Sequence, residues 1–133
     1  MYKFDVIGPI VGKQRPRVNM CTGNVYTPGK TKDYEEFIRQ SFFVVYPSHQ
    51  MLNSRVKMNI IAYFKIPKSA NNEKEMLENN VSPTKKPDID NITKIVLDAI
   101  NNYVIKDDIQ VTKISVEKRY GVEEKLTIEI EEY

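Results

Sequence analysis

Hydrophobic and polar residues alternate in four segments of the chain, and this period of two is typical of β-strands. The first two segments, residues 2–7 and 55–66, each place a row of apolar side chains on one face. The second also carries Ile61 and Tyr63 on its other face, so we expect it inside a sheet rather than at an edge. The inward rows are Tyr2, Phe4 and Val6, and then Val56, Met58, Ile60, Ala62 and Phe64.

Two further alternating segments, residues 110–120 and 124–132, end the sequence, and Gly121 lies between them. Two such runs joined by a short glycine-containing connection predict an antiparallel hairpin. The side chains expected to point inward are Ile114, Val116 and Tyr120 in the first strand and Leu126, Ile128 and Ile130 in the second.

Two segments have the 3.6-residue period of an amphipathic helix. The first begins at Thr31, a suitable N-cap, and the second is capped by Asp90 or Asn91. Their apolar stripes are Tyr34, Phe37, Ile38, Ser41, Phe42 and Val45 in the first, and Ile92, Ile95, Val96, Ala99, Ile100 and Tyr103 in the second.

Two polar segments separate these elements. Residues 8–30 contain four of the five glycines and three of the seven prolines, which predicts a long loop with a small hairpin around residues 21–26. Residues 67–87 are polar and bounded by prolines, with a short helix expected within 69–78. The element order predicts an α+β fold: a mixed, largely antiparallel sheet packed against two main helices, in a single domain over residues 1–133.

Composition limits the chemistry. A single cysteine, Cys21, and a single histidine, His49, leave no intramolecular disulfide and no Cys/His zinc cluster. Any metal must therefore be bound by oxygen ligands. The N-terminal residues lack the basic and apolar regions of a signal peptide, and the run FFVVY is too short to span a bilayer. We expect a cytoplasmic protein without a membrane segment.

Positive charge is concentrated near the N-terminus. Residues 11–32 hold five basic side chains and no acid, whereas residues 123–133 hold five glutamates and one lysine. Arginines in such a segment suit phosphate contacts. A solvated loop explains the same composition, and this segment alone favours that simpler interpretation.

Acidic residues stand just before the second helix. If residues 88–90 are extended, the carboxylates of Asp88 and Asp90 can converge on one point. At a separation of about 4 Å they would repel by roughly 4 kcal/mol at an effective dielectric constant near 20, so the pair requires a cation such as a divalent metal. Lys94, one turn beyond Asp90, compensates part of the charge. A helix cap with a solvated neighbour is the alternative, and the Asp-Ile-Asp-Asn segment alone favours it.

A second acidic pair, Asp107 and Asp108, follows the helix. Because a 13-residue helix is about 20 Å long, the two pairs meet only if the chain turns back. An EF-hand loop is excluded, since the positions that need an oxygen ligand and glycine hold Ile92 and Thr93. We expect Asp98 to be a structural ion-pair or hydrogen-bond partner.

Two other catalytic motifs do not fit the chain. It has no P-loop sequence, and a Ser-His-Asp triad would have to use His49 without a nucleophile elbow. We expect His49 at the surface or at a helix end.

The run KKPDIDNITKIVLDAINNYVIKDDIQV resembles the signature of the RusA-type Holliday junction resolvases, endodeoxyribonucleases common in phages and prophages. The segments KQRPRVNM, VYTPGKTKDYEEFIR and FKIPKS also resemble this family, so the resemblance spans most of the chain. One departure is Asn102, where many members have glycine; asparagine tolerates the left-handed backbone that such a turn needs.

The resemblance implies that Asp88, Asp90 and Asp108 hold catalytic Mg²⁺, with Mn²⁺ as a substitute, that Lys94 is the essential lysine, and that Asp107 is less central. It also implies a homodimer that makes paired symmetric nicks in four-way DNA during recombination and repair. The residues we expect to grip the DNA backbone are Arg15, Arg17, Tyr26, Lys30, Lys32, Lys85 and Lys86. Two alternatives remain: a non-catalytic protein that binds branched DNA, and a metal-dependent phosphohydrolase acting on other DNA structures.

Overall fold

A computed structural model describes residues 1–26 and 28–133. Its centre is one four-stranded sheet, whose strands are β1 (Tyr2–Ile7), β4 (Val56–Lys65), β5 (Val111–Gly121) and β6 (Lys125–Glu132). Their order is β1-β6-β4-β5, and only the β4–β5 pair in this sheet is parallel. The predicted α+β fold with a mixed, largely antiparallel sheet is confirmed. The strand expected in the interior, β4, lies between two neighbours.

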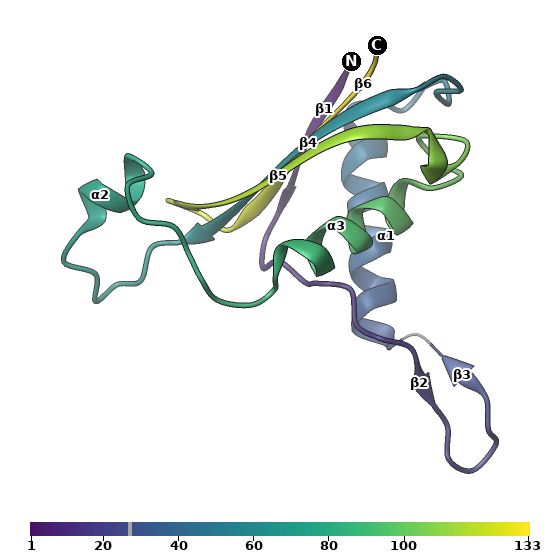
Figure 1. The fold of residues 1–133 in the computed structure, drawn as a ribbon, viewed down its shortest axis with the longest axis horizontal. Helices are drawn as coiled ribbons and strands as arrows, with labels where there is room; N and C mark the ends of the chain where they lie inside the picture. Colours follow the sequence, from purple (N-terminus) through teal and green to yellow (C-terminus); the bar gives the residue numbers. More distant parts are fainter. Residues whose placement is uncertain (27) are drawn as a thin grey trace.

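Two long helices, α1 (Gly29–Val45) and α3 (Ile89–Ile100), lie on the same side of this sheet (Figure 1). The smaller elements are the hairpin β2 (Arg17–Val18) and β3 (Val25–Tyr26), the helix α2 (Glu73–Leu77) and the 3-10 turn η1 (Asp108–Gln110). The short helix expected within residues 69–78 is thus confirmed as α2, and a small hairpin is present in the long N-terminal loop. No helix in the described part of the chain is long and apolar enough to cross a bilayer.

The core fills the space between the sheet and the two long helices. Strand β4 buries every second residue, as its period of two predicts. On the helix side, α3 contributes five residues with no exposed surface. Together these side chains form one cluster, which includes Phe4, Val6, Ile38, Phe42, Val56, Ile60, Phe64, Ile92, Ile95, Val96, Ile100, Leu126, Ile128 and Ile130.

The predicted hairpin between the last two strands is wrong. Strand β4 lies between β5 and β6 and pairs with both, parallel to β5 and antiparallel to β6. The connection after Gly121 therefore spans two strand spacings, about 9.6 Å. The physical reason is that β4 carries apolar residues on both faces and gains most from the interior position. As a result β5 is an edge strand, and Ile114, expected inward, is 39 % exposed.

Helix α1 begins earlier than predicted. Its N-cap is Pro28 rather than Thr31. Thr31 lies in the first turn of the helix, and it is completely buried. The buried stripe is also narrower than the periodicity indicated, because Phe37 and Val45 are exposed whereas Tyr34 and Ile38 are buried. The helix contacts α3 and β1.

Helix α3 also begins earlier than predicted. Its N-cap is Asp88, with an extended backbone, rather than Asp90 or Asn91. The helix ends at Ile100, and Tyr103 lies beyond it with 45 % of its surface exposed. Asn102 has a φ of +67°, which confirms that asparagine adopts the left-handed backbone expected of this turn.

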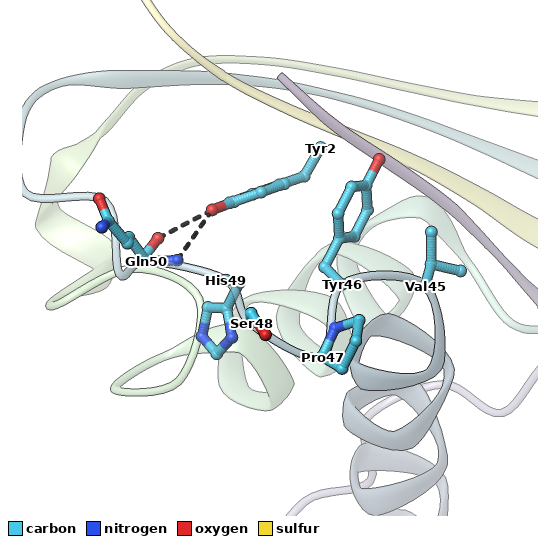
Figure 2. Close-up of a pocket in the computed structure, with 7 residues that line it drawn as sticks. All are labelled: Tyr2, Val45, Tyr46, Pro47, Ser48, His49 and Gln50. Atoms are coloured by element: carbon cyan, nitrogen blue, oxygen red, sulfur yellow. Dashed lines mark hydrogen bonds between the residues drawn. The ribbon is translucent and has the colours of Figure 1, made fainter.

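Aromatic side chains close the core at the C-terminal end of α1. A pocket of about 510 Å³ lies there. Figure 2 shows its lining residues, among which the Tyr2 hydroxyl donates to the Gln50 carbonyl and accepts from the Gln50 amide. His49 lies just past α1, as expected, with Nε2 2.7 Å from the Tyr103 carbonyl oxygen. This pocket is lined by no carboxylate among the described residues.

We predict that Phe42→Ala lowers the free energy of unfolding by about 3–5 kcal/mol, as measured by urea denaturation. Phe42 has no exposed surface, and its ring lies 5.0–5.6 Å from those of Tyr2, Phe4, Phe43, Tyr46 and His49. Val44→Ala is the control on the same helix, because Val44 is 81 % exposed, and we expect a change within about 0.5 kcal/mol. Equal losses for the two variants would contradict the packing described.

Candidate metal site and nucleic-acid interface

A cavity of about 780 Å³ opens at the N-terminus of α3. The helix contributes Asp90, Asn91 and Lys94 to its lining, with Asp88 at the cap. The loop of residues 10–17 also lines the cavity, as do Lys30 near the start of α1 and residues 86–87 before α3. The cavity thus brings together three residues predicted for catalysis and part of the basic N-terminal segment.

Asp88 and Asp90 owe their positions to the start of the helix. One Asp88 oxygen, Oδ1, accepts a hydrogen bond from the Asn91 amide at 2.8 Å, which is an N-cap interaction. Asp90 follows in the first turn. Both carboxylates therefore lie where the unpaired N–H groups and the helix dipole favour negative charge, by about 0.3–1 kcal/mol each.

Lys94 pairs with Asp90 across one helical turn, at 3.1 Å from Nζ to Oδ2. The side chains of Lys94 and Asp90 are 58 % and 70 % exposed, so water screens the pair, which contributes little to stability. Among the described residues, Asp90 Oδ1 and Asp88 Oδ2 accept no hydrogen bond. Each carboxylate thus keeps one oxygen available to a ligand.

Cationic side chains dominate the rest of the lining, six against the two carboxylates. Of the seven residues predicted to bind DNA, the cavity includes Arg15, Arg17, Lys30 and Lys86. The other three lie elsewhere: Tyr26 is on β3, Lys32 is exposed on α1, and Lys85 places its ammonium 5.4 Å from the Phe64 ring centroid. The excess of positive charge suits a phosphate-bearing ligand.

Lys13 has a structural role that the sequence did not indicate. Its ammonium lies 2.7 Å from Glu35 Oε1 on α1 and 2.9 Å from Asp98 Oδ2 on α3. Burial lowers the pKa of Lys13, but hydrogen bonds and charge from Glu35 and Asp98 outweigh burial and raise the pKa above its usual value. Asp98 is thus the structural ion-pair partner that we expected, and Lys13 ties the loop to both helices.

The same loop packs closely on the start of α3. The Lys13 amide donates to the Asn91 carbonyl at 3.0 Å. A Cβ added at Gly12 would stand 2.6 Å from Pro87 Cβ and 3.1 Å from Asn91 Cβ, so only glycine fits without displacing the loop. These contacts bring Arg15 and Arg17 to the cavity. No periodic pattern marks Gly12 or Lys13, because their partners lie far away in the sequence.

Asp108 lies at the other end of α3. Its amide donates to Asn101 Oδ1 at 3.0 Å, and Asn101 is eleven residues beyond Asp90, about 16 Å along a helix axis. Burial raises the pKa of the Asp108 carboxyl above its usual range, and a hydrogen bond with Asp107 and the negative charges of Asp107 and Asp98 raise it further. Asp107 caps η1. Asp108 therefore lies in an acidic group separate from the cavity.

The described residues of a single chain bring no three acidic, histidine or cysteine side chains together as a metal site. Asp88 and Asp90 share one cavity, whereas Asp108 does not line it. One chain thus supplies two carboxylates of the three that the resemblance implies. Two carboxylates with free oxygens fit Mg²⁺, which prefers oxygen ligands and keeps several waters.

A carboxylate pair in a basic cavity is chemically suited to a metal ion and a phosphodiester ligand. The chain belongs to the endodeoxyribonuclease RusA family, because the sequence model of that family matches residues 8–131. It is also similar to the uncharacterized protein YqaN of Bacillus subtilis (strain 168), with 34 % identity over an alignment that covers 98 % of this chain and 95 % of that protein. The resemblance seen in the sequence is confirmed, and the family indicates a DNA endonuclease of the Holliday-junction-resolving type.

We predict that Lys13→Met lowers the free energy of unfolding by about 1–3 kcal/mol, because the carboxylate of Glu35, only 14 % exposed, loses its cation. Urea denaturation measures the change. Lys74→Met is the matched control, since Lys74 and Glu78 form an exposed pair at 4.0 Å, and it should change stability by less than about 0.5 kcal/mol. A loss no larger than that of the control would show that Lys13 does not tie the loop to the helices.

Proposed function

We propose that this protein is a Mg²⁺-dependent endodeoxyribonuclease that resolves four-way DNA junctions by paired symmetric cleavage in recombination and repair. The main support is that Asp88 and Asp90 line one cavity, in which every other charged residue is basic. The family match supports DNA as the substrate.

The donor set suits the proposed metal. Asp88 and Asp90 each keep an oxygen without a hydrogen bond in the described structure, and both lie beside the helix N-terminus. When bound, Mg²⁺ polarises the phosphoryl group and lowers the pKa of an attacking water. Mn²⁺ has similar ligand preferences and should substitute.

The chain's own residues position the DNA and balance its charge. Arg15 and Arg17 can hold phosphates in bidentate fashion, and Lys30 and Lys86 add charge at the rim. Lys94 now pairs with Asp90. If Asp90 held the metal, the Lys94 ammonium would be free to stabilise the negative charge that develops on the phosphoryl oxygens.

The proposed role of Asp108 conflicts with its place in one chain, about 16 Å along α3 from Asp90. A homodimer, which the resemblance implies, contains a second copy of every carboxylate. Two symmetric active sites would also match two symmetric cuts in a four-way junction. We therefore include Asp108 in the proposed metal site, with its chain of origin as a question for experiment.

Two other functions make different predictions. A non-catalytic binder of branched DNA uses the aspartates as caps. Asp88 does cap α3, but among the described residues Asp90 accepts a hydrogen bond from Lys94 rather than from a backbone amide, and it lines the cavity. A phosphohydrolase for other DNA structures would cut flaps or linear duplex as fast as junctions. Comparing the cleavage rates of these three substrates separates the second alternative from the proposal.

We predict that Asp90→Asn reduces Mg²⁺-dependent cleavage of a synthetic four-way junction by a factor on the order of 10³, since a metal contributes several kcal/mol to the transition state. Junction binding should be retained or slightly tighter, because a negative charge is removed. Asp33→Asn, an exposed acid on α1, makes the same charge change outside the cavity and should cleave normally. Intact junctions after incubation of folded wild-type protein with Mg²⁺ or Mn²⁺ would exclude the nuclease.

Mixing two inactive variants tests where Asp108 acts. If Asp108 completes the site of the partner chain, a heterodimer of Asp90→Asn and Asp108→Asn chains contains one intact site and should nick one strand. If Asp108 serves its own chain, every site in the mixture lacks one carboxylate and no nicks form. Denaturing gels of a labelled junction distinguish the outcomes, and cleavage by Asp108→Asn alone would remove Asp108 from the proposed site.

A further inference from the structure

The β2–β3 hairpin projects away from the sheet and helices (Figure 1), and several of its apolar side chains are exposed. Val18 is 55 % exposed, Val25 is 67 % exposed, and Met20 at the tip is 92 % exposed. Single exposed apolar residues are ordinary, but several together on one projection commonly mark a binding surface. The packing of the core does not account for them, because none belongs to the core cluster.

The tip of this hairpin is a defined turn. The Asn19 amide donates to the Asn24 carbonyl and the Gly23 amide to the Asn19 carbonyl, both at 2.7 Å. The side chain of Asn19 accepts from the amides of Cys21 and Thr22 at 2.9 and 3.3 Å. The hairpin can therefore present its side chains in a fixed arrangement.

The hairpin has two chemically different faces. Val18 pairs with Val25 and Arg17 pairs with Tyr26 in the antiparallel register. Directly opposed residues share a face and successive residues alternate, so the two valines lie on one face and Arg17 with Tyr26 on the other. Arg17 also lines the cavity that holds Asp88 and Asp90. The valine face, formed by Val18 and Val25, is thus opposite the face that carries Arg17.

Charge favours DNA over a second copy of the chain as the partner of this hairpin. Residues 6–32 contain five basic side chains and no acid, so two such segments in contact would repel each other. Duplex DNA presents phosphates and groove edges to its surroundings. Its apolar base-pair faces are exposed only where stacking is interrupted, as at an opened branch point, and proteins do insert apolar side chains between base steps.

The hairpin also has a suitable reach. Arg17 and Val18 are consecutive residues of β2, about 3.3 Å apart along the strand, which is close to one stacked base step of 3.4 Å. A phosphate held by Arg17 at the cavity would therefore lie within a few base steps of the valine face. At such a short distance, the hairpin could contact the branch point while Arg17 stays at the cavity.

We propose that the β2–β3 hairpin recognises the branch itself, with its valine face and Met20 seated on an open base-pair face while Arg17 holds the backbone of the strand in the cavity. The hairpin thereby discriminates branched from linear DNA. This inference rests on the proposed function, since it presumes a branched DNA substrate.

The test is the double variant Val18→Thr/Val25→Thr, which keeps the shape and the strand propensity of valine. Binding is measured in EDTA on a four-way junction and on a linear duplex of the same sequence, with 2-aminopurine at the branch. We expect the junction affinity to fall about tenfold, as loss of apolar burial implies. The change in 2-aminopurine fluorescence that accompanies binding should become smaller in the double variant than in the wild type. Linear-duplex affinity should change less than about twofold, because backbone contacts set it.

Val44→Thr, on exposed α1 surface, is the matched control and should keep the junction preference. Equal urea midpoints for all variants confirm that each is folded. An unchanged junction preference in the double variant would overturn the proposal, as would a change of oligomeric state by light scattering, which would make the valine face an interface between copies. If wild-type protein itself shows no preference for the junction, the proposed function fails and not the hairpin alone.

Discussion

The burial of one face of α3 against the sheet is the constraint on which the site depends. Ile92, Ile95, Val96, Ala99 and Ile100 have no exposed surface, so the helix can neither rotate nor slide without exposing several of them. At about 25 cal/mol per Å² of apolar area, exposing even one such side chain costs roughly 1.5–3 kcal/mol. The polar face of α3, and the direction of its N-terminus, are fixed as a consequence.

The N-terminus of α3 reduces the electrostatic cost of placing two carboxylates close together. Asp88 and Asp90 are placed where amide groups and the helix dipole offset part of their charge, and Lys94 offsets more. These effects do not neutralise two carboxylates, and the remaining free oxygens face a cavity with six cationic side chains. The charges of this cavity are therefore suited to a positive ion and a polyanion at the same place.

Lys13 connects the long N-terminal loop to the two helices that pack on the sheet. The ammonium joins Glu35 of α1 to Asp98 of α3, and Gly12 allows the loop to touch Pro87. One consequence is that Arg15, Arg17 and the hairpin beyond them start from a defined point at the cavity. The polar face of α3 thus serves two purposes: its first turns present the acidic pair, and its later turn anchors the loop that carries the basic residues.

The sequence by itself determined the parts of this protein that depend on short-range spacing. The period of two in β4, the apolar stripe of α3 and the relation of Asp88, Asp90 and Lys94 are properties of neighbouring residues on a regular backbone. They could be predicted, as could the family. Only the tertiary structure decided that β4 separates β5 from β6, that Lys13 binds Glu35 and Asp98, and that Asp108 lies at the far end of α3. These relations join residues tens of positions apart, or across the length of a helix, and they are set by which surfaces the whole chain can bury together, a quantity that no local pattern contains.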